Sequence, residues 1–227
     1  MKRKTQIAAF FALCAVLLAA CSHQQPNSEK LLKDSGLSNV DTYLQMVSDY
    51  QKGKTPEQDF NCRTAAFTLL EDIVSAAKQE NYSNYLMFDM DAIDNDKAFK
   101  AIQDHKSEFI ALFEGASVES VPNDRFEQVY PALLKERNVK FSNDKAALIS
   151  VVMHDPDEKR LFVGHAGVLV KNGNSYQFFE KLAPNEEYQS KIFASKEDLK
   201  KELLSRSNYF EKGAHDPMIY ENGVLLK

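Results

Sequence analysis

The chain has 227 residues, and its 28 Lys and Arg against 33 Asp and Glu give a formal net charge of −5 at pH 7. A chain of this length buries about 70% of the surface that its unfolded form exposes, so it can build one domain with a sizeable core. An acidic surface disfavours nucleic acid and anionic lipid as ligands. Composition and charge therefore argue against a nucleic-acid-binding protein.

Residues 1–20 have the order of a secretory signal peptide. Residues 2–4 are Lys, Arg and Lys, and the apolar run over residues 7–20 ends in two alanines before Cys21. A membrane-spanning helix needs about 20 apolar residues, and polar residues interrupt this run too early for that. The sequence therefore predicts a secreted protein whose first segment is removed.

The sequence Leu18-Ala19-Ala20-Cys21 resembles the lipobox of bacterial lipoproteins, whose cysteine is diacylated and becomes the new N-terminus. The resemblance implies a membrane anchor, since each buried methylene of a lipid chain contributes about 0.8 kcal/mol. Ser22 follows the cysteine, which in a Gram-negative cell indicates the outer membrane. Residues 21–27 would be a lipidated tether and residues 28–227 a single domain. The alternative is an ordinary signal peptide or anchor helix in which the cysteine is incidental.

Helical patterns dominate the first part of the chain. Apolar residues recur at helical spacing after Asn61, and either Asn61 or Asp59 is the natural N-cap of a helix whose first turn contains Cys62. Helices are predicted over residues 28–36, 39–51, 61–77, 96–114 and 124–137.

The later part of the chain changes to β-type patterns. Runs rich in Val, Ile, Leu and Phe cover residues 146–153, 161–170 and 175–182, with turn signals between them. These runs predict a three-stranded antiparallel meander, followed by a helix over residues 196–207 and an extended segment over residues 218–226. The order of elements indicates an α+β fold in which N-terminal helices pack on a C-terminal antiparallel sheet.

Cys62 is the first candidate for chemistry. Once residues 1–20 are removed, Cys62 is the one cysteine besides the lipidated Cys21, so it has no second thiol with which to form an internal disulfide. The positive end of a helix favours thiolate over thiol and lowers the pKa of a cysteine there below the free value of about 8.5. Arg63 would act in the same direction.

The meander supplies a candidate base and a carboxylate to orient it. A two-residue turn at Asn172-Gly173 pairs Lys171 with Asn174. In this register His165 lies directly across from Glu180, with Cβ atoms about 4.5–5.5 Å apart. A carboxylate at that distance can hold one tautomer of the imidazole.

The order of cysteine on an early helix, histidine on a later strand and carboxylate on the next strand resembles that of papain-like cysteine peptidases. The strand beginning Gly164-His165-Ala166-Gly167-Val168 is also similar to the histidine strand of NlpC-like cell-wall peptidases. The resemblance implies a papain-like core in which Cys62 is the nucleophile, His165 the base and Glu180 the orienting residue. It also implies a peptide or peptidoglycan substrate, with no cofactor. Asn61 and Gln58 precede the cysteine and are candidates for stabilising an oxyanion.

Structural roles are the alternative for the same residues. Free cysteine is among the most buried residue types, so Cys62 could pack against the sheet. His165 could be a hydrogen-bonded core histidine, and Glu180 could pair with Lys181 or face solvent.

Metal binding is not expected. The acidic segment over residues 89–96 departs from an EF-hand loop, with Asp94 where glycine is required and Lys100 where glutamate is required, so a solvated turn is expected instead. Zinc-type ligands are available, but their spacing follows no zinc pattern. These residues are His154, Asp155, Asp157 and His165.

Segments across the whole domain resemble one family of bacterial lipoproteins, catalogued as domain of unknown function 4300, over residues 38–226. The segments that carry the resemblance are residues 61–64, 86–93, 149–155, 161–169, 179–183, 188–189 and 217–222. The resemblance implies lipidation, secretion and a shared fold, and it implies no activity. Two functions stay open: an envelope lipoprotein with a Cys/His/Glu hydrolase site for peptide or amide bonds, or a non-enzymatic surface lipoprotein that binds a protein or a small ligand.

Overall fold

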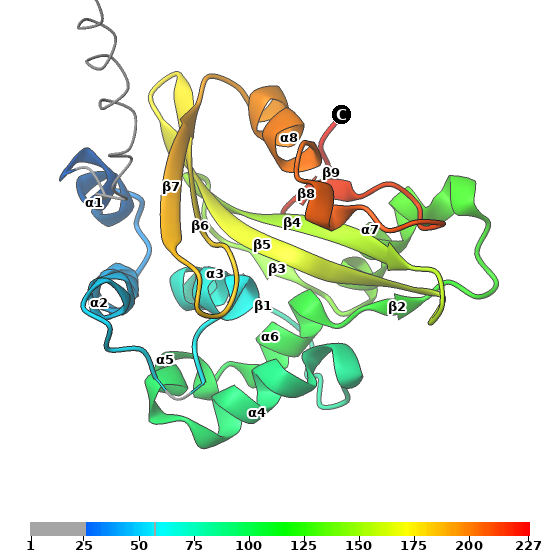
Figure 1. Ribbon diagram of the computed structural model, residues 1–227, viewed down its shortest axis with the longest axis horizontal. Helices are drawn as coiled ribbons and strands as arrows, with labels where there is room; N and C mark the ends of the chain where they lie inside the picture. The colour runs from blue at the N-terminus through cyan, green and yellow to red at the C-terminus, as the bar shows by residue number, and fades with distance from the viewer. Residues whose placement is uncertain (1–25, 57) are drawn as a thin grey trace, which may run out of the picture.

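The computed structural model describes residues 26–56 and 58–227 and shows helices packed against a large antiparallel sheet (Figure 1). The predicted α+β class is therefore confirmed. The predicted signal peptide and the lipidation site at Cys21 lie outside the described residues, so both stay predictions.

The large sheet has the strand order β7-β6-β5-β4-β8-β9, and β2 pairs with β5 beside this path. Every neighbouring pair is antiparallel. Its strands are β2 (Ala116–Ser117), β4 (Ala146–Asp155), β5 (Arg160–Asn172), β6 (Ser175–Lys181), β7 (Tyr188–Phe193), β8 (Met218–Glu221) and β9 (Val224–Leu225). The predicted meander is confirmed as β4-β5-β6, and β7 extends it beyond the predicted strands. A second, small sheet pairs β1 (Val74–Ser75) with β3 (Lys140–Phe141).

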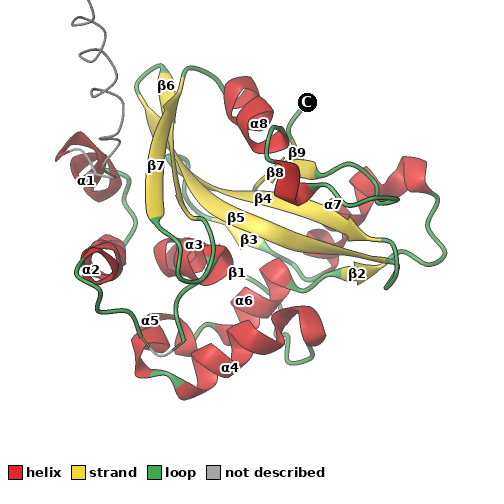
Figure 2. Ribbon diagram, viewed as in Figure 1, coloured by secondary structure: helices red, strands yellow, loops and turns green. Residues whose placement is uncertain are grey.

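The helices lie on both sides of the large sheet, with α3, α4 and α6 on one side and α8 on the other (Figure 2). The α-helices are α1 (Pro26–Lys33), α2 (Val40–Gln51), α3 (Cys62–Leu70), α4 (Met87–Asn95), α5 (Lys100–Gln103), α6 (Lys106–Phe113), α7 (Phe126–Glu136) and α8 (Lys196–Leu204). The 3₁₀ helices are η1 (Glu71–Ile73), η2 (Asn84–Leu86), η3 (Lys97–Phe99), η4 (Asn123–Arg125) and η5 (Ser207–Tyr209).

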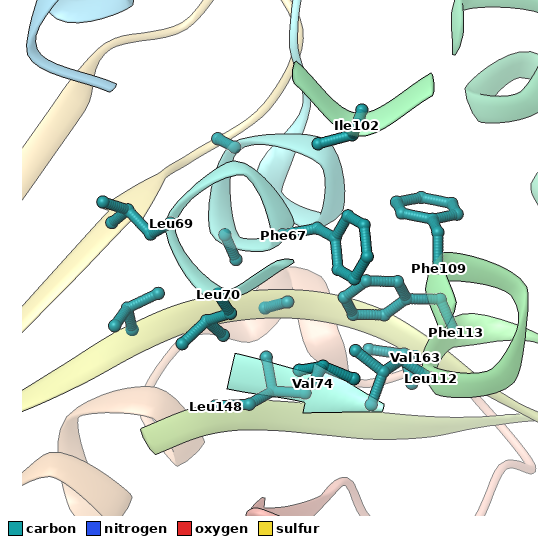
Figure 3. Packing of buried hydrophobic residues seen from close by; sticks show 14 of the residues in the cluster. Phe67, Leu69, Leu70, Val74, Ile102, Phe109, Leu112, Phe113, Leu148 and Val163 are labelled. Carbon is teal, nitrogen blue, oxygen red and sulfur yellow. The ribbon is translucent and has the colours of Figure 1, made fainter. Parts of the chain in front are cut away.

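The sheet separates two hydrophobic clusters, because successive side chains of a strand point to opposite faces. Along β4, Leu148 belongs to the larger cluster and Ile149 to the smaller one. The larger cluster includes Phe67 of α3, whose ring packs edge-on against Phe109 and Phe113 of α6 at centroid distances of 5.4 and 6.4 Å (Figure 3). The smaller cluster lies beneath α8 and η5. Any group that reaches from α3 to the α8 side must therefore pass the sheet at an edge.

Two predicted helices differ from the structure. The helix predicted over residues 61–77 ends at Leu70, because Val74 adopts extended backbone and pairs with Phe141 of β3. The helix predicted over residues 96–114 divides into η3, α5 and α6.

The predicted register between β5 and β6 is wrong by two positions. The two-residue turn consists of Gly173 and Asn174, so Asn172 pairs with Ser175. Gly173 has a φ of +59°, and a type II′ hairpin turn requires glycine at its first central position. A turn centred on Asn172 and Gly173 would instead place glycine at the second central position, as in a type I′ turn. As a result, Gly167 and not His165 lies across from Glu180.

Candidate active site

The thiol of the site lies at the first position of α3, where a capping box fixes the start of the helix. The side-chain oxygen of Asn61 accepts hydrogen bonds from the backbone N–H groups of Arg63 and Thr64, at 2.9 and 3.0 Å. The Thr64 hydroxyl accepts from the backbone N–H of Asn61 at 3.0 Å. Of the two predicted caps, Asn61 and not Asp59 is therefore the N-cap, and Cys62 occupies the positive end of the helix.

A buried ion pair ties this helix end to its neighbours. Arg63 binds both carboxylate oxygens of Asp89 in α4, at 2.6 and 3.2 Å, and Asp89 is 1% exposed. Arg63 also donates to the backbone oxygen of Val163 in β5 at 3.0 Å. Asn61 donates to Asp89 through Nδ2 at 2.7 Å. The segment over residues 89–96 is thus largely helical, and its first carboxylate holds the cysteine helix in place; the expected solvated turn is wrong.

The N-terminal end of α3 contacts β5 where that strand has a free edge. β2 pairs with β5 at residues 160–161 and β6 pairs with it at residues 167–172, which leaves the stretch between them beside α3. Val151 pairs with His165 and Val152 pairs with Val163, so Gly164 is the extra residue of a β-bulge. The backbone oxygen of Gly164 lies 3.9 Å from Sγ of Cys62. The bulge thus brings α3 and the histidine strand together at the sheet edge.

His165 and Glu180 form a direct pair across β5 and β6. Glu180 lies opposite Gly167, two residues from His165, and both side chains point to the α8 side of the sheet. Gly167 has no side chain to separate them, so the diagonal contact can close. His165 Nε2 lies 2.5 Å from Glu180 Oε2. The predicted partnership therefore exists, although it is diagonal and not directly opposed.

Two further side chains hold Glu180. Arg206, which follows α8, donates from Nη2 to Oε1 at 2.7 Å and from Nη1 to Oε2 at 2.8 Å. Gln189 of β7 donates to Oε1 at 2.9 Å. The alternative that Glu180 pairs with Lys181 is wrong, because Lys181 points to the other face and binds Asp59 at 3.0 Å. Arg206 was missed because no local pattern marks it; it reaches Glu180 only when α8 packs on the sheet.

The charges of the site are coupled. Burial alone raises the pKa of the Cys62 thiol, but the hydrogen bond to His165 and the charges of His165 and Arg63 outweigh burial, so the pKa is lowered. Burial lowers the pKa of His165, whereas its hydrogen bonds to Cys62 and Glu180 raise the value to about 9. Burial raises the pKa of Glu180, but hydrogen bonds from Arg206 and His165 lower it to about 2. These shifts favour a thiolate beside an imidazolium.

The side chains of Cys62, His165 and Glu180 are largely buried. Cys62 is 7% exposed and His165 is 3% exposed. The ring of Tyr209 in η5 lies 5.6 Å from the His165 ring, and its hydroxyl accepts a hydrogen bond from Arg206 at 3.0 Å. Tyr209 thereby shields the contact between His165 and Glu180 from water, which strengthens the electrostatic interaction between them.

Comparison with known proteins decides the family. The profile of the family described as a domain of unknown function (DUF4300) matches residues 6–226. The chain belongs to this family. No curated protein matches the DUF4300 chain, and no solved structure matches it. The predicted family is thus confirmed, and the function must be argued from the site itself.

The two predicted oxyanion candidates are held by other groups. Asn61 uses its oxygen for capping and its Nδ2 for Asp89, and Gln58 donates from Nε2 to Asp91 at 2.7 Å. The backbone N–H of Cys62 lies in the first turn of α3, where an N–H group has no intrahelical partner. Within residues 26–56 and 58–227, no group accepts a hydrogen bond from it. This N–H is therefore available to a ligand beside the thiol.

The four residues with zinc-type side chains are held by other groups or lie apart. His154 Nδ1 accepts from the backbone N–H of His215, and Asp155 accepts from the Tyr85 hydroxyl and from the backbone of Asp157. In the described part of the chain, no group of three His, Cys, Asp or Glu side chains is placed to hold a metal ion. None of the described helices is both long and apolar enough to cross a membrane.

Proposed function

We propose that this DUF4300 chain is a cysteine hydrolase of peptide or amide bonds, with Cys62 as nucleophile, His165 as acid and base, and Glu180 as the residue that orients the imidazole. The observation that carries the proposal is the continuous chain of contacts from the thiol at the helix end, through a buried imidazole, to a carboxylate clamped by Arg206. An activated nucleophile, a base and a group that orients the base are what covalent catalysis requires.

The carboxylate assigns the two ring nitrogens their roles. Glu180 binds Nε2 of His165, so Nδ1 is the nitrogen that remains for Cys62. Because the hydrogen bonds from Arg206 keep Glu180 ionised and fixed against the opposing effect of burial, the imidazole is held in one orientation. Tyr209 and Gln189 complete the surroundings of this pair.

The reaction proceeds through a thioester. The Cys62 thiolate attacks the carbonyl carbon and forms a C–S bond, while the carbonyl electron pair moves to oxygen and faces the Cys62 N–H. The His165 imidazolium gives its proton to the departing nitrogen as the C–N bond breaks. Water then attacks the thioester, His165 takes the water proton, and the C–S bond breaks to restore the thiolate and the imidazolium.

The same proposal places the enzyme in the cell envelope. Its support is the signal-like segment ending in Leu18-Ala19-Ala20-Cys21, which predicts a lipid anchor on Cys21. A peptide or peptidoglycan substrate fits that location. The burial of Cys62 and His165 favours the second candidate, a non-enzymatic lipoprotein that binds a protein or a small ligand.

The pH dependence of iodoacetamide alkylation separates the two candidates. Modification of the Cys62 peptide is followed by mass spectrometry in the native chain, in His165→Ala and in His105→Ala. His105 is a matched control because its side chain is 39% exposed and pairs with Glu71. We expect alkylation that persists well below pH 8, is shifted to higher pH in His165→Ala and is unchanged in His105→Ala. A thiol that reacts only after denaturation would overturn the hydrolase and leave the binding protein.

A further inference from the structure

A buried ion pair links the segment before the thiol to the strand that carries Glu180. Nζ of Lys181 lies 3.0 Å from Oδ2 of Asp59, and the two side chains are 0% and 5% exposed. Asp59 precedes Cys62 by three positions, and three extended residues span at most about 11 Å. Lys181 directly follows Glu180 in β6, and β6 passes beside α3 (Figure 1). The pair therefore connects the backbone on the thiol side of the site with the backbone on the carboxylate side.

Further contacts hold both charges of the Asp59–Lys181 pair in place. Nζ of Lys181 lies 4.4 Å from the centre of the Tyr50 ring and 4.7 Å from that of the Tyr188 ring, and it donates to a backbone oxygen of the β6–β7 loop. The Asp59 carboxylate accepts a hydrogen bond from a backbone N–H of the same loop at 2.7 Å. A buried ion pair offsets the cost of its desolvation only when its geometry is good and additional hydrogen bonds are made. The pair meets both conditions and has one defined geometry.

The residues between Asp59 and the thiol are also anchored, but to other parts of the molecule. The ring of Phe60 stacks on that of Phe99 in η3, with 4.2 Å between the ring centres. The side chain of Asn61 is held by a carboxylate of α4. Both of these anchors are helical, whereas the anchor of Asp59 lies in the large sheet. The Asp59–Lys181 pair therefore relates the segment before the thiol to the sheet.

The pair adds a second attachment of the thiol region to the sheet. Arg63 provides another attachment, since it donates to the backbone oxygen of Val163 in β5 at 3.0 Å. One attachment would leave the end of α3 free to rotate about the contact. Two attachments on different strands fix both the position and the direction of the helix end relative to the sheet.

Stability alone does not account for the Asp59–Lys181 pair, because replacing a buried ion pair with apolar residues of similar shape often leaves stability unchanged or increases it. We infer that the pair is a positioning device, which sets Sγ of Cys62 against the imidazole of His165. Lys181 acts through Asp59 and the backbone that leads to the thiol. This role rests on the proposed pairing of nucleophile and base, and it adds the contact that keeps the two groups aligned.

The test replaces the ion pair with an apolar contact in the full chain. The double variant Asp59→Leu, Lys181→Met keeps the approximate shapes of the two side chains and removes both charges. Lys191→Met with Glu202→Leu is the matched control, because it removes a surface ion pair between β7 and α8 in the same way. Three quantities are measured in each chain: the urea midpoint of unfolding, the pH midpoint for alkylation of the thiol and, by NMR, the pKa of His165.

We expect the double variant to keep a urea midpoint close to that of the native chain. Lys181→Met alone should lower it, because the buried charge of Asp59 is then left uncompensated. In the double variant the alkylation midpoint should rise by about one pH unit or more, towards the free cysteine value of about 8.5. The pKa of His165, about 9 in the native chain, should fall because its contact with Cys62 is loosened. The control should change none of these quantities.

Unchanged titrations of Cys62 and His165 in a folded double variant would overturn the inference and leave the pair with a structural role only. If the double variant does not fold, Asp59→Asn decides, because it keeps a hydrogen bond from Lys181 and removes the charge. Native titrations in that variant would also overturn the inference. A thiol that is inert in the native chain would overturn the hydrolase, whereas a fall in the His165 pKa of the double variant would still support the positioning role.

Discussion

The two halves of the site are built in different ways. The thiol half is fixed at its start by contacts close in sequence, since the capping bonds between Asn61 and Thr64 span three residues. The imidazole half depends on distant contacts, because His165 and Glu180 are 15 residues apart and Arg206 is a further 26 residues along. A local sequence pattern can therefore specify where α3 begins, whereas only tertiary packing can specify the imidazole half.

The halves also differ in charge. The thiol half combines a neutral cap with the ion pair between Arg63 and Asp89. The imidazole half concentrates its charges on one carboxylate, because Glu180 interacts with both Arg206 and His165 while it is only 4% exposed. Removing one partner of a buried charge is costly, since the remaining charge is left uncompensated. The imidazole half should therefore be sensitive to the loss of either Arg206 or His165.

Arg206→Ala is expected to give the largest effect. Loss of the bidentate contact to Glu180 should lower the free energy of unfolding by about 3–5 kcal/mol, as for other broken buried ion pairs. Arg206→Lys keeps the charge without the planar fork and should fall between the native chain and Arg206→Ala. Urea unfolding followed by circular dichroism measures these differences.

The matched control for this substitution is Arg125→Ala, which removes an exposed arginine and should change stability by less than about 0.5 kcal/mol. If Arg206→Ala lowers the free energy of unfolding by less than about 1 kcal/mol, the contacts of Arg206 with Glu180 do not stabilise the imidazole half. The contrast between the two halves is then lost.

The same contrast explains what could be predicted from the sequence. The start of α3 and the meander were predictable because a cap and runs of β-forming residues are local signals. β7 was missed because its polar and apolar residues do not alternate, with Gln189, Ser190 and Lys191 in succession. Arg206 and the bulge at Gly164 were not predictable, because each depends on how separate elements pack.

The pairing of His165 with Glu180 was predicted in spite of a wrong register. The predicted and observed registers differ by two residues, and a shift of two keeps every side chain on the same face of the sheet. A shift of one would have placed Glu180 among the residues that face α3. The face of the sheet on which Glu180 lies was therefore predicted correctly, although the residue of β5 directly opposite it was not.

Lowering the pH should reduce the free energy of unfolding by less than Arg206→Ala does. The pKa of Glu180 in the folded chain is about 2, below the ordinary value of 4.5, so its contribution to stability is present above the ordinary value and is lost as pH falls towards 2. Between pH 5 and pH 3 the loss attributable to this group should be about 2 kcal/mol.

Urea unfolding of the native chain and of Glu180→Gln at the two pH values isolates this effect. The pH dependence of the native chain should exceed that of Glu180→Gln by the stated amount. Glu158→Gln, which removes an exposed carboxylate, should retain the native dependence. Equal pH dependence in the native chain and in Glu180→Gln would mean that the clamped carboxylate does not titrate as its contacts require.

Asn61→Ala tests the thiol half and should give the smallest effect on stability. Loss of an N-cap costs about 1 kcal/mol, and the first turn of α3 then frays, which weakens the helix end that supports the Cys62 thiolate. The alkylation profile of Cys62 should move to higher pH. Asn61→Ser also loses the contact to Asp89 but keeps a capping oxygen, so it should restore most of the stability and the profile.

The serine substitution also decides whether Asn61 acts on an oxyanion. Removing an oxyanion donor lowers kcat by about 10²–10³. Because Asp89 already holds Nδ2 of Asn61, we expect Asn61→Ser to reduce cleavage of a peptide substrate by less than about tenfold. A loss of a hundredfold or more with native stability would assign the amide a catalytic role. The thiol half would then depend on a contact that forms only with substrate, and it would no longer be the locally determined half of the site.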